Sequence, residues 1–442
     1  MRDSLFILLQ RLKGGGFTKQ WRTTKAIRSE KDLSICNQYL REALLAAFHN
    51  VPYYHNIFGQ TMLNEKKLNF EKFDSTPLLA KDTIRKQGES LASIDYTRRK
   101  WYYNSSGGST GEPIRFIRDK LSDKWTEATL KYYYENIIGI DELRIRKIVL
   151  WGSERDIFKG TMGYQAKITN WLSNQKLLNS FRMTQTDMEH YVKIINSYKP
   201  ELIRGYVSSL YELCKFVERN KLSIHRPKIV VSGAEKLRKE AREKIESIFQ
   251  TKVYDLYGSR EVPAIAGECK SGLLHIFTFN NYLEVLDSMN RPVKEGEMGR
   301  IILTQLHNYS MPLIRYDIGD LGIPGPSRCT CGNPLPTLKE INGRVSDHFV
   351  KQDGTIIHGE YFTHLFYLKD FVKAFQVRQE DYKRIRILVV LQRQLDSVSK
   401  YDIENKIKLV MGQDCTVIWE FVDTIPETKS GKYIYTKSLL YS

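Results

Sequence analysis

Apolar residues in the middle of the chain follow two different periods, which predict alternating strands and helices. Short apolar runs predict buried strands at residues 148–151, 229–231 and 252–257. Apolar residues at helical spacing predict helices at residues 31–50, 123–134, 187–198, 208–219 and 237–249. Strands that alternate with helices are typical of a sheet covered by helices, so the sequence predicts an α/β fold with mixed α+β subdomains.

The pattern changes after about residue 273, where short strands and turns predict a β-rich subdomain. Its strands are expected at residues 283–286, 299–304 and 313–316, and a stretch dense in Gly, Pro and Cys follows at 322–336. The tail has its own predicted strands at 385–391 and 416–421 and a helix at 399–410. We therefore expect a large N-terminal domain at 1–342 and a small mobile C-terminal α+β domain at 343–442.

The composition is that of a globular protein, with 41% hydrophobic and 27% charged residues, which argues against disorder or a fibre. No apolar run approaches the length of about 18 residues that a membrane span needs. The apolar run at 5–9 is too short for a signal peptide. We expect a cytoplasmic protein without an integral membrane segment; an amphipathic helix expected at 4–12, followed by three glycines, leaves peripheral membrane contact open.

The chain carries 68 Lys and Arg residues against 51 Asp and Glu, which gives a formal charge of +17. Such a charge either attracts phosphate groups or forms a solvated basic surface. The basic residues spread along the whole chain without a block of five, and no nucleic-acid-binding motif is present. We expect no nucleic-acid partner.

A glycine-rich stretch with hydroxyl residues is the most informative motif. It is followed by Glu112 and Pro113 and comprises Ser105, Ser106, Gly107, Gly108, Ser109, Thr110 and Gly111. Glycines let backbone N–H groups approach phosphate oxygens, and the hydroxyl groups add donors. A Gly/Ser turn without a ligand fits the same letters equally well. The Gly-Lys-Ser/Thr ending of a Walker A loop is absent.

Four further segments downstream are common when taken singly, and the information lies in their order. Two of them follow predicted strands, where ligands bind in an open α/β sheet. The segments are Ser232-Gly233-Ala234-Glu235, Tyr257-Gly258-Ser259-Arg260-Glu261, Tyr316-Asp317-Ile318-Gly319-Asp320 and Gly343-Arg344-Val345-Ser346-Asp347.

In this order the motifs resemble the adenylate-forming superfamily of acyl-CoA synthetases, peptide-synthetase adenylation domains and luciferase. Within it, the chain is similar to the phenylacetate–CoA ligase branch, including the CapK-like proteins associated with capsular polysaccharide synthesis. The resemblance runs from residues 76–82 to the C-terminus. It implies that residues 105–111 hold the β- and γ-phosphates of ATP.

The resemblance also implies a role for each matching residue. Gly233, Ala234 and Glu235 would flank the adenine and the acyl pocket. Tyr257 would stack near adenine. The nucleotide-binding segment that begins with Tyr257 continues through Gly258, Ser259 and Arg260. Glu261 would ligate Mg²⁺, Asp320 would bind the ribose, and Arg344 would hold the ribose or phosphates. Lys432, after Gly431, would be the catalytic lysine. Trp151, Arg204, Gly205, Tyr206 and Ser208 fall where the family lines its acyl pocket.

The chain departs from the family pattern at four points. The phosphate loop has Gly107-Gly108 where one glycine is usual, and no lysine follows Pro113. Arg260 replaces the usual Thr or Ser, and Ser346 stands at the hinge position that Asp or Lys usually holds. These differences concern the substrate and the domain motion more than the nucleotide site.

Four potential metal ligands predict a structural zinc site. Cys269, His275, Cys329 and Cys331 form a Cys₃His set, which is a standard tetrahedral zinc shell. The Cys-x-Cys spacing is unusual, and free buried thiols with a hydrogen-bonded histidine are the alternative. Some members of the resembled branch bind zinc at this location.

The resemblance implies an AMP-forming ligase that converts a carboxylic acid into an acyl-adenylate with Mg·ATP. The acyl group would then pass to an acceptor, first of all the thiol of CoA, which makes the chain an acid–thiol ligase. An amide ligase that acylates an amine in capsular or O-antigen polysaccharide synthesis is the alternative. A non-catalytic nucleotide-binding scaffold of a polysaccharide machine is the second alternative. The sequence does not give the acid, the acceptor or the oligomeric state.

Overall fold

The computed structural model describes residues 17–64, 67–105, 114–152, 164–342, 349–357, 359–366, 369, 371–425 and 435–440. Several predicted features lie outside the described residues. These are the expected helix at 4–12, phosphate-loop residues 106–111, the expected hinge at 343–347 and the segment around Lys432. No helix of the described chain is both long and apolar enough to cross a bilayer.

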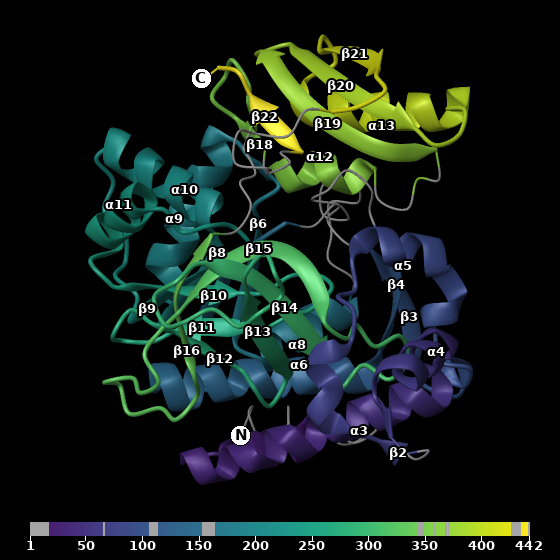
Figure 1. Ribbon diagram of the computed structural model, residues 1–442. Coiled ribbons are helices and arrows are strands. Elements are labelled where there is room, and N and C mark those ends of the chain that lie inside the picture. The colour runs from purple at the N-terminus through teal and green to yellow at the C-terminus, as the bar shows by residue number, and fades with distance from the viewer. Residues whose placement is uncertain are drawn as a thin grey trace.

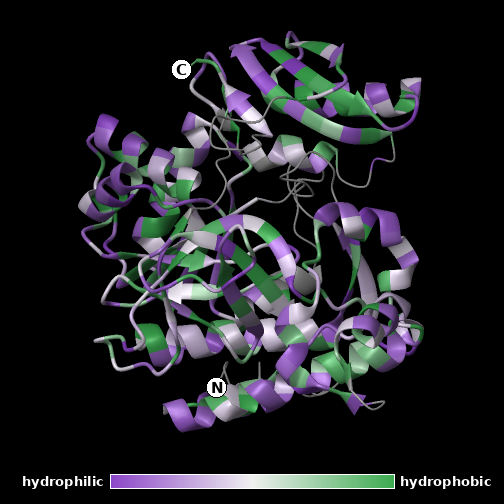
Figure 2. Cartoon of the chain, in the orientation of Figure 1, coloured by the Kyte–Doolittle hydropathy of each residue, from purple (hydrophilic) through white to green (hydrophobic). Residues whose placement is uncertain are grey.

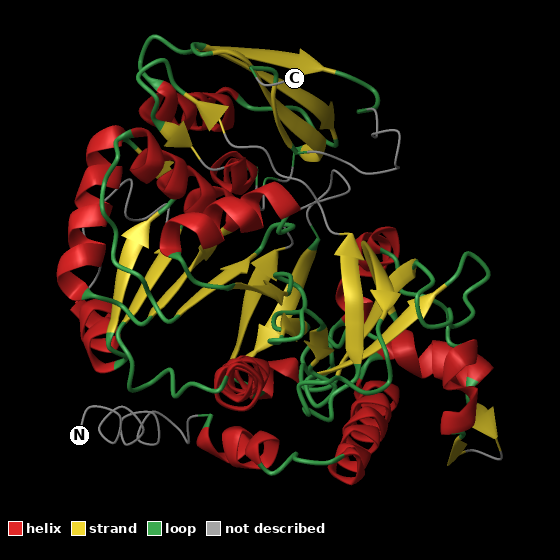
Figure 3. Ribbon diagram, turned by 90° about the vertical axis from the view of Figure 1, so that its left-hand side faces the viewer, coloured by secondary structure: helices red, strands yellow, loops and turns green. Residues whose placement is uncertain are grey.

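A mixed sheet of 11 strands forms the centre of the molecule (Figures 1 and 3). Five strands at one end run parallel: β6 (Gln175–Asn179), β5 (Lys147–Trp151), β8 (Leu202–Tyr206), β9 (Ile229–Gly233) and β10 (Val253–Tyr257). The sheet continues antiparallel through β11 (Ala266–Glu268), β12 (Leu274–Ile276), β16 (Thr337–Asn342), β15 (Tyr316–Pro324), β14 (Gly299–Gln305) and β13 (Asn281–Leu286). The expected β-rich part therefore extends the same sheet.

Helices cover both faces of the parallel strands because successive strand residues point to opposite sides. Ile203 and Val230 pack against one helical layer, and their neighbours Leu202 and Val231 pack against the other. The first layer consists of α9 (Gln185–Tyr198), α10 (Val207–Arg219) and α11 (Lys239–Phe249). The second consists of α6 (Lys120–Tyr132), which continues as the π-helix η5 (Tyr133–Ile138). A short α8 (Tyr164–Leu172) precedes β6.

Most N-terminal segments pack on the antiparallel end of the sheet and share its largest apolar core, whereas the first helix, Thr18–Lys25, packs against α6. Their helices are α2 (Thr18–Lys25), α3 (Ser34–Asn50), α4 (Pro52–Thr61) and α5 (Lys81–Gln87), with 3₁₀ turns η1 (Glu30–Leu33), η2 (Phe70–Ser75), η3 (Gly88–Leu91) and η4 (Tyr96–Arg98). The strands are β1 (Leu63–Asn64), β2 (Lys67–Leu68), β3 (Trp101–Ser105) and β4 (Arg115–Asp119). Strands β3 and β4 pair antiparallel and flank the predicted phosphate loop.

The C-terminal residues build a second sheet with its own core (top of Figure 1). Its strands, in spatial order, are β21 (Thr416–Phe421), β20 (Arg384–Leu391), β19 (Val372–Asp381) and β22 (Thr436–Ser438). Bands of hydrophobic and hydrophilic residues follow one another along β19 (Figure 2), whereas the second half of β20, from Ile387 to Leu391, is apolar throughout. The apolar side packs against α12 (Gly359–Leu365) and α13 (Ser397–Met411).

A small sheet links the two parts of the chain. The hairpin β17 (Phe349–Val350) and β18 (Ile356–Ile357) pairs with β7 (Arg182–Met183), which lies between β6 and α9 in the sequence. The side chain of Gln379 in β19 also bonds the backbone of Val350. The predicted boundary between residues 342 and 343 falls between β16 and this hairpin and stays a prediction.

The predicted strand at 313–316 is wrong for three of its four residues. Arg315 has a φ of 48°, so the chain turns there, and β15 begins only at Tyr316. A left-handed conformation interrupts strand geometry for any residue with a Cβ. The apolar Leu313 and Ile314 that suggested a strand are instead fully buried in the main core.

Candidate functional site

A cavity of about 420 Å³ opens at the carboxyl ends of β5, β8, β9 and β10. Parallel strands place their carboxyl ends at one edge of the sheet, where ligands bind in open α/β folds. Most of the described candidate residues from separate sequence motifs line this cavity. They are Trp151, Tyr206, Gly233, Ala234, Glu235, Tyr257, Gly258, Ser259, Arg260, Glu261 and Asp320.

Tight backbone turns place the strand-end motifs around the cavity. Ala234, directly after β9, has a left-handed φ of 67°. A Cβ added to Gly258 would lie 2.8 Å from the backbone nitrogen of Ala264, so only glycine fits at that turn. The two turns expose backbone groups of residues 233–235 and 257–261 to the same space.

Two buried carboxylates are held in fixed orientations on the antiparallel side of the cavity. The Tyr257 hydroxyl donates to Asp320 Oδ2 at 2.8 Å, which joins the end of β10 to β15. The Tyr316 hydroxyl donates to Glu261 Oε1 at 3.2 Å, and Gln305 Nε2 donates to the Glu261 carbonyl at 2.6 Å. Glu261 is 1% and Asp320 is 6% exposed. The predicted magnesium and ribose ligands therefore lie in one cavity.

Glu235 lies on the opposite side, at the N-terminus of α10. Its carboxylate accepts the backbone N–H of Ser208 at 2.7 Å and the Ser208 hydroxyl at 3.2 Å. A carboxylate at a helix N-terminus is stabilised by the free N–H groups and the helix dipole. Ser208 does not line the cavity itself, but it holds the carboxylate of Glu235, which does.

Aromatic side chains form the wall predicted for the acyl group. The rings of Trp151 and Tyr206 stack with centroids 4.2 Å apart, and Phe181 stacks beyond Tyr206. A Cβ added to Gly152 would lie 1.7 Å from the Phe181 ring, so glycine is required for this packing. The ring of Phe181 meets His364 of α12 edge-on.

The C-terminal part of the chain closes one side of the cavity. Thr363 and Tyr435 line it, and Arg260 contacts the imidazole Nε2 of His364. Arg260 replaces the small hydroxyl residue of the resembled pattern, and its length lets it reach α12. Sequence reasoning did not single out His364, Thr363 or Tyr435, because their places depend on how the two parts pack.

Asp255 of β10 also lines the cavity and was missed from the sequence. Burial, together with the nearby Glu268, raises the pKa of Asp255 to about 7. Ser232 Oγ donates to Asp255 Oδ1 at 3.2 Å. An Asp inside an otherwise apolar strand is the signal that was available.

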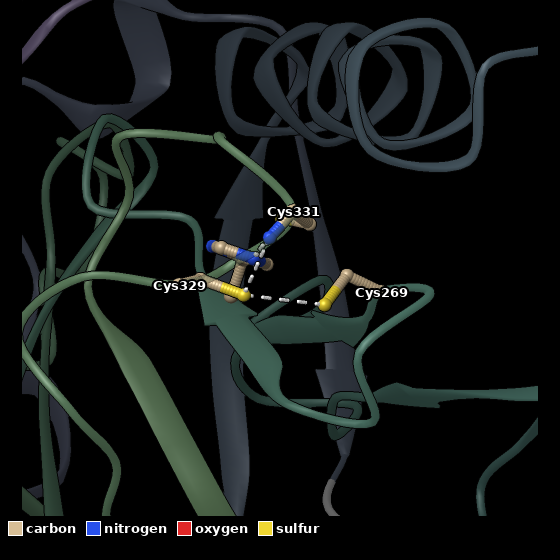
Figure 4. Close-up of side chains that lie close together, drawn as sticks. Cys269, Cys329 and Cys331 are labelled. Atoms are coloured by element: carbon tan, nitrogen blue, oxygen red, sulfur yellow. Dashed lines mark hydrogen bonds between the residues drawn. The ribbon is translucent and has the colours of Figure 1, made fainter.

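The four predicted metal ligands come together from three places: Cys269 directly after β11, His275 within β12, and Cys329 and Cys331 on the loop before β16. Their ligand atoms all lie within 4.8 Å of one another. Cys269 Sγ is 3.6 Å from Cys329 Sγ, and His275 Nε2 is 3.1 Å from Cys331 Sγ. Figure 4 shows the three cysteines converging, with the Cys331 backbone N–H directed at the Cys329 sulfur.

The donor set fits a tetrahedral metal ion. The Nδ1 of His275 lies 2.9 Å from the Leu335 carbonyl, so Nδ1 carries the proton and Nε2 is free to bind metal. Burial raises the pKa of the Cys269 thiol, but its contacts with His275 and with backbone N–H groups outweigh burial and lower the pKa to about 6. Burial raises the pKa of Cys331 to about 12. A metal ion would deprotonate that thiol.

Comparisons with known proteins agree with this geometry. Residues 349–438 match the CapK C-terminal domain. The chain is 25% identical to protein CapK of Staphylococcus aureus over 96% of this chain and 95% of that protein. It is 30% identical to phenylacetate-coenzyme A ligase of Thermus thermophilus over 173 residues, which are 37% of this chain and 38% of that ligase.

Solved structures show the same fold. The 2-hydroxyisobutyryl-CoA ligase, in complex with 2-HIB-AMP and CoA in its thioesterification state, superposes with a TM-score of 0.59. The alignment covers 92% of this chain and 90% of that ligase at 17% identity. An open conformation of that ligase gives a TM-score of 0.56. The chain is an adenylate-forming, CapK-like protein with the fold of the acyl-CoA ligases.

Proposed function

We propose that this protein activates a carboxylic acid with Mg·ATP and transfers the acyl group to a small-molecule acceptor. The observation that carries the proposal is the meeting of Glu235, Tyr257, Glu261 and Asp320 around one cavity at the sheet edge. These residues come from two motifs at strand ends and one motif within β15, which resemble those of adenylate-forming enzymes. Burying both carboxylates costs free energy of desolvation, which a bound ribose and a bound metal ion would offset.

A carboxylate is a poor acyl donor because its oxide leaving group is too basic. In the proposed reaction a carboxylate oxygen attacks the α-phosphorus of ATP, the bond between that phosphorus and the α,β-bridging oxygen breaks, and pyrophosphate leaves with the electron pair of that bond. The acceptor then attacks the acyl carbon, and AMP leaves with the electron pair of the broken C–O bond. The protein contributes positioning and charge neutralisation, as in other phosphoryl transfers.

Each described residue has a proposed part in this reaction. Tyr257 and the 233–235 turn would hold the adenine, and Asp320 would accept hydrogen bonds from the ribose hydroxyls. The hydrogen bond from Tyr257 orients Asp320 for that task. Glu261, oriented by Tyr316, would hold Mg²⁺, which when bound offsets the charge of the leaving pyrophosphate.

Lys432, Arg344 and loop residues 106–111 complete the proposed site by resemblance. Tyr435 lines the cavity only three positions after Lys432 in the sequence, which supports a role for that lysine. A lysine between the two reacting anions would cancel their repulsion. At ~4 Å and an effective dielectric of ~20, one such contact stabilises by about 4 kcal/mol.

The proposed test measures acid-dependent exchange of labelled pyrophosphate into ATP across a panel of acids. We expect exchange with at least one acid and its loss in Lys432→Ala. Lys429→Ala, which changes a lysine of the same segment, is the matched control and should keep exchange. ATP binding without exchange for any acid would support the scaffold alternative instead.

The acceptor is tested in the same system by adding CoA or amines after the acid is known. We propose the CoA thiol first, because the phenylacetate-coenzyme A ligases are relatives by sequence. The match to CapK over nearly the whole chain supports the amine of a sugar as the second candidate. Product mass separates a thioester from an amide.

We also propose that Cys269, His275, Cys329 and Cys331 bind one structural zinc ion. The converging ligand atoms and the orientation of His275 support it. Four protein ligands would leave no position for substrate, so the ion would stabilise the loops at 269–275 and 329–335 rather than take part in the reaction.

A further inference from the structure

Arg204 occupies a position in the cavity where a charged residue needs an explanation. It lies in β8 opposite Val149 of β5 and Val231 of β9. Its side chain shares a face with Leu202, two residues earlier, which packs against the α6 and η5 layer. Arg204 lines the cavity together with Leu130 of α6. Arg204 is thus a half-buried guanidinium on the central one of the five parallel strands.

The described contacts of Arg204 are neutral. The guanidinium lies over the ring of Trp151, 5.4 Å from its centroid. Burial raises the pKa of Tyr134, and Arg204 beside it acts in the opposite direction. The Nε atom is buried and has no hydrogen-bond partner among the described residues.

Two other arginines of the described chain, one buried and one half-buried, are paired with a carboxylate. Arg315 forms a two-point contact with Glu284, and Arg242 lies 2.8 Å from Glu268. No described carboxylate forms such a pair with Arg204. The carboxylates that line the same cavity bond elsewhere: Glu235 to Ser208, Asp255 to Ser232, Glu261 to Tyr316 and Asp320 to Tyr257.

A half-buried guanidinium without a carboxylate partner is stabilised when an anion binds beside it, and its planar fork matches a carboxylate or another oxyanion. Two strand spacings of about 4.8 Å separate β8 from β10, so an anion at Arg204 would lie roughly 10 Å from the strand that ends at Tyr257. That separation suits an acid whose two ends lie at opposite sides of the cavity.

We infer that Arg204 determines specificity by receiving a second, non-reacting oxyanion of the acid, so that the preferred substrate is a dianion. The inference rests on the proposed activation of an acid and names its chemical class. Trp151 and Tyr206 would cover the apolar middle of such a substrate.

The test compares acids that differ only in the second anion. Succinate, adipate and suberate are paired with butyrate, hexanoate and octanoate, and terephthalate and 4-sulfobenzoate are paired with benzoate. Pyrophosphate release gives kcat and KM for wild type, Arg204→Met, Arg204→Lys and the control Arg219→Met. Arg219 also lies over an aromatic ring, that of Phe216, but at the exposed end of α10.

For wild type we expect at least one dianion to exceed its monoanion in kcat/KM. Arg204→Met should lower kcat/KM for that dianion about a hundredfold, roughly 2.8 kcal/mol at 1.4 kcal/mol per tenfold. The loss should fall on KM, since the contact is made before and during the reaction. Activity on the monoanion should change less than threefold, and Arg204→Lys should lie between. Arg219→Met should match wild type.

A second measurement does not depend on turnover. The preferred dianion should raise the thermal unfolding temperature of wild type and of Arg219→Met, but not that of Arg204→Met. The inference would be overturned if wild type had a higher kcat/KM for every monoanion than for its paired dianion. It would also be overturned if Arg204→Met lowered kcat/KM equally for both classes of acid. Either result would leave the proposed function unaffected. If no acid of either class supported pyrophosphate release, the proposed function would be contradicted, and the inference with it.

Discussion

Arg315 offers a sharp test of how the main domain is held together, because one buried guanidinium joins three segments. Its Nε and Nη2 donate to the Glu284 carboxylate at 3.1 and 2.9 Å. Its Nη1 donates to the carbonyls of Asp74 and Thr76 at 2.6 and 2.7 Å. The side chain is 3% exposed. Arg315 thus ties the chain before α5 to β13 and to the start of β15, the strand that carries Asp320.

We predict that Arg315→Met lowers the free energy of unfolding by about 4–6 kcal/mol. Removing one partner of a buried ion pair costs about 3–5 kcal/mol, because the other charge stays buried. The two carbonyls also lose their donor, and an unsatisfied buried acceptor adds about 1 kcal/mol or more. The neighbouring pair Arg300 and Asp317 is partly exposed. Arg300→Met should therefore cost about 1 kcal/mol or less.

The pH dependence of the effect has a definite sign. Burial raises the pKa of Glu284, against the opposing effect of Arg315. Without Arg315 the carboxylate must be buried as a charge or protonated, and protonation is easier at low pH. The difference in the free energy of unfolding between wild type and Arg315→Met should therefore shrink as the pH falls from 8 towards 5. Because one proton is bound, the change is at most about 1.4 kcal/mol per pH unit.

Equilibrium unfolding in urea at several pH values measures these quantities. The double variant Arg315→Met with Glu284→Leu removes both charges and should recover part of the lost stability. Two results would refute the reasoning. One is that Arg315→Met is as stable as Arg300→Met. The other is that adding Glu284→Leu to Arg315→Met lowers the free energy of unfolding by as much as Glu284→Leu does in wild type.

Three further predictions concern the cavity and the metal ligands. Tyr257→Phe removes the hydrogen bond that orients Asp320 and should raise KM for ATP roughly five- to tenfold, as about 1–1.4 kcal/mol implies; an unchanged KM would contradict the proposed ribose contact. Purification without chelators should give one zinc per chain by elemental analysis, and Cys329→Ser with Cys331→Ser should lose the zinc and unfold at a lower temperature; zinc-free wild type would exclude the site. The pKa of Asp255 is raised to about 7, so its contribution to stability is full below the unfolded pKa of about 4 and is lost as the pH rises through 7. Asp255→Asn should flatten the fall in stability between pH 4 and 7 by up to 1.4 kcal/mol per unit, and an unchanged slope in urea unfolding would contradict this.

The local pattern predicted β5, β9 and β10 of the parallel sheet, because each is a short apolar run, and it missed β6 and β8. The run at 229–231 became β9 and the run at 252–257 became β10. The same rule was wrong at Leu313 and Ile314, since apolar residues before a left-handed Arg315 are buried without forming a strand. Burial and strand pairing are separate requirements, and periodicity reports only the first.

The site was predictable where a motif marks a strand end, and less so where distant segments meet. Resemblance placed Tyr257 and Asp320 in one site, but not the hydrogen bond between them. Ligand chemistry brought Cys269 and Cys329 together despite unusual spacing. The pairing of β7 with β18 and the contact of Arg260 with His364 depend on how two parts of the chain pack. No local signal encodes such contacts, and the domain boundary, the hinge and Lys432 stay predictions.

The central claim is that a carboxylate oxygen attacks the α-phosphorus of ATP, and an isotope experiment tests it most directly. An acid found by exchange is labelled with heavy oxygen in its carboxylate and converted to product with CoA or an amine. The account predicts that the released AMP carries one labelled oxygen, and that Lys432→Ala forms none. Label in inorganic phosphate with release of ADP, or AMP without label, would contradict it.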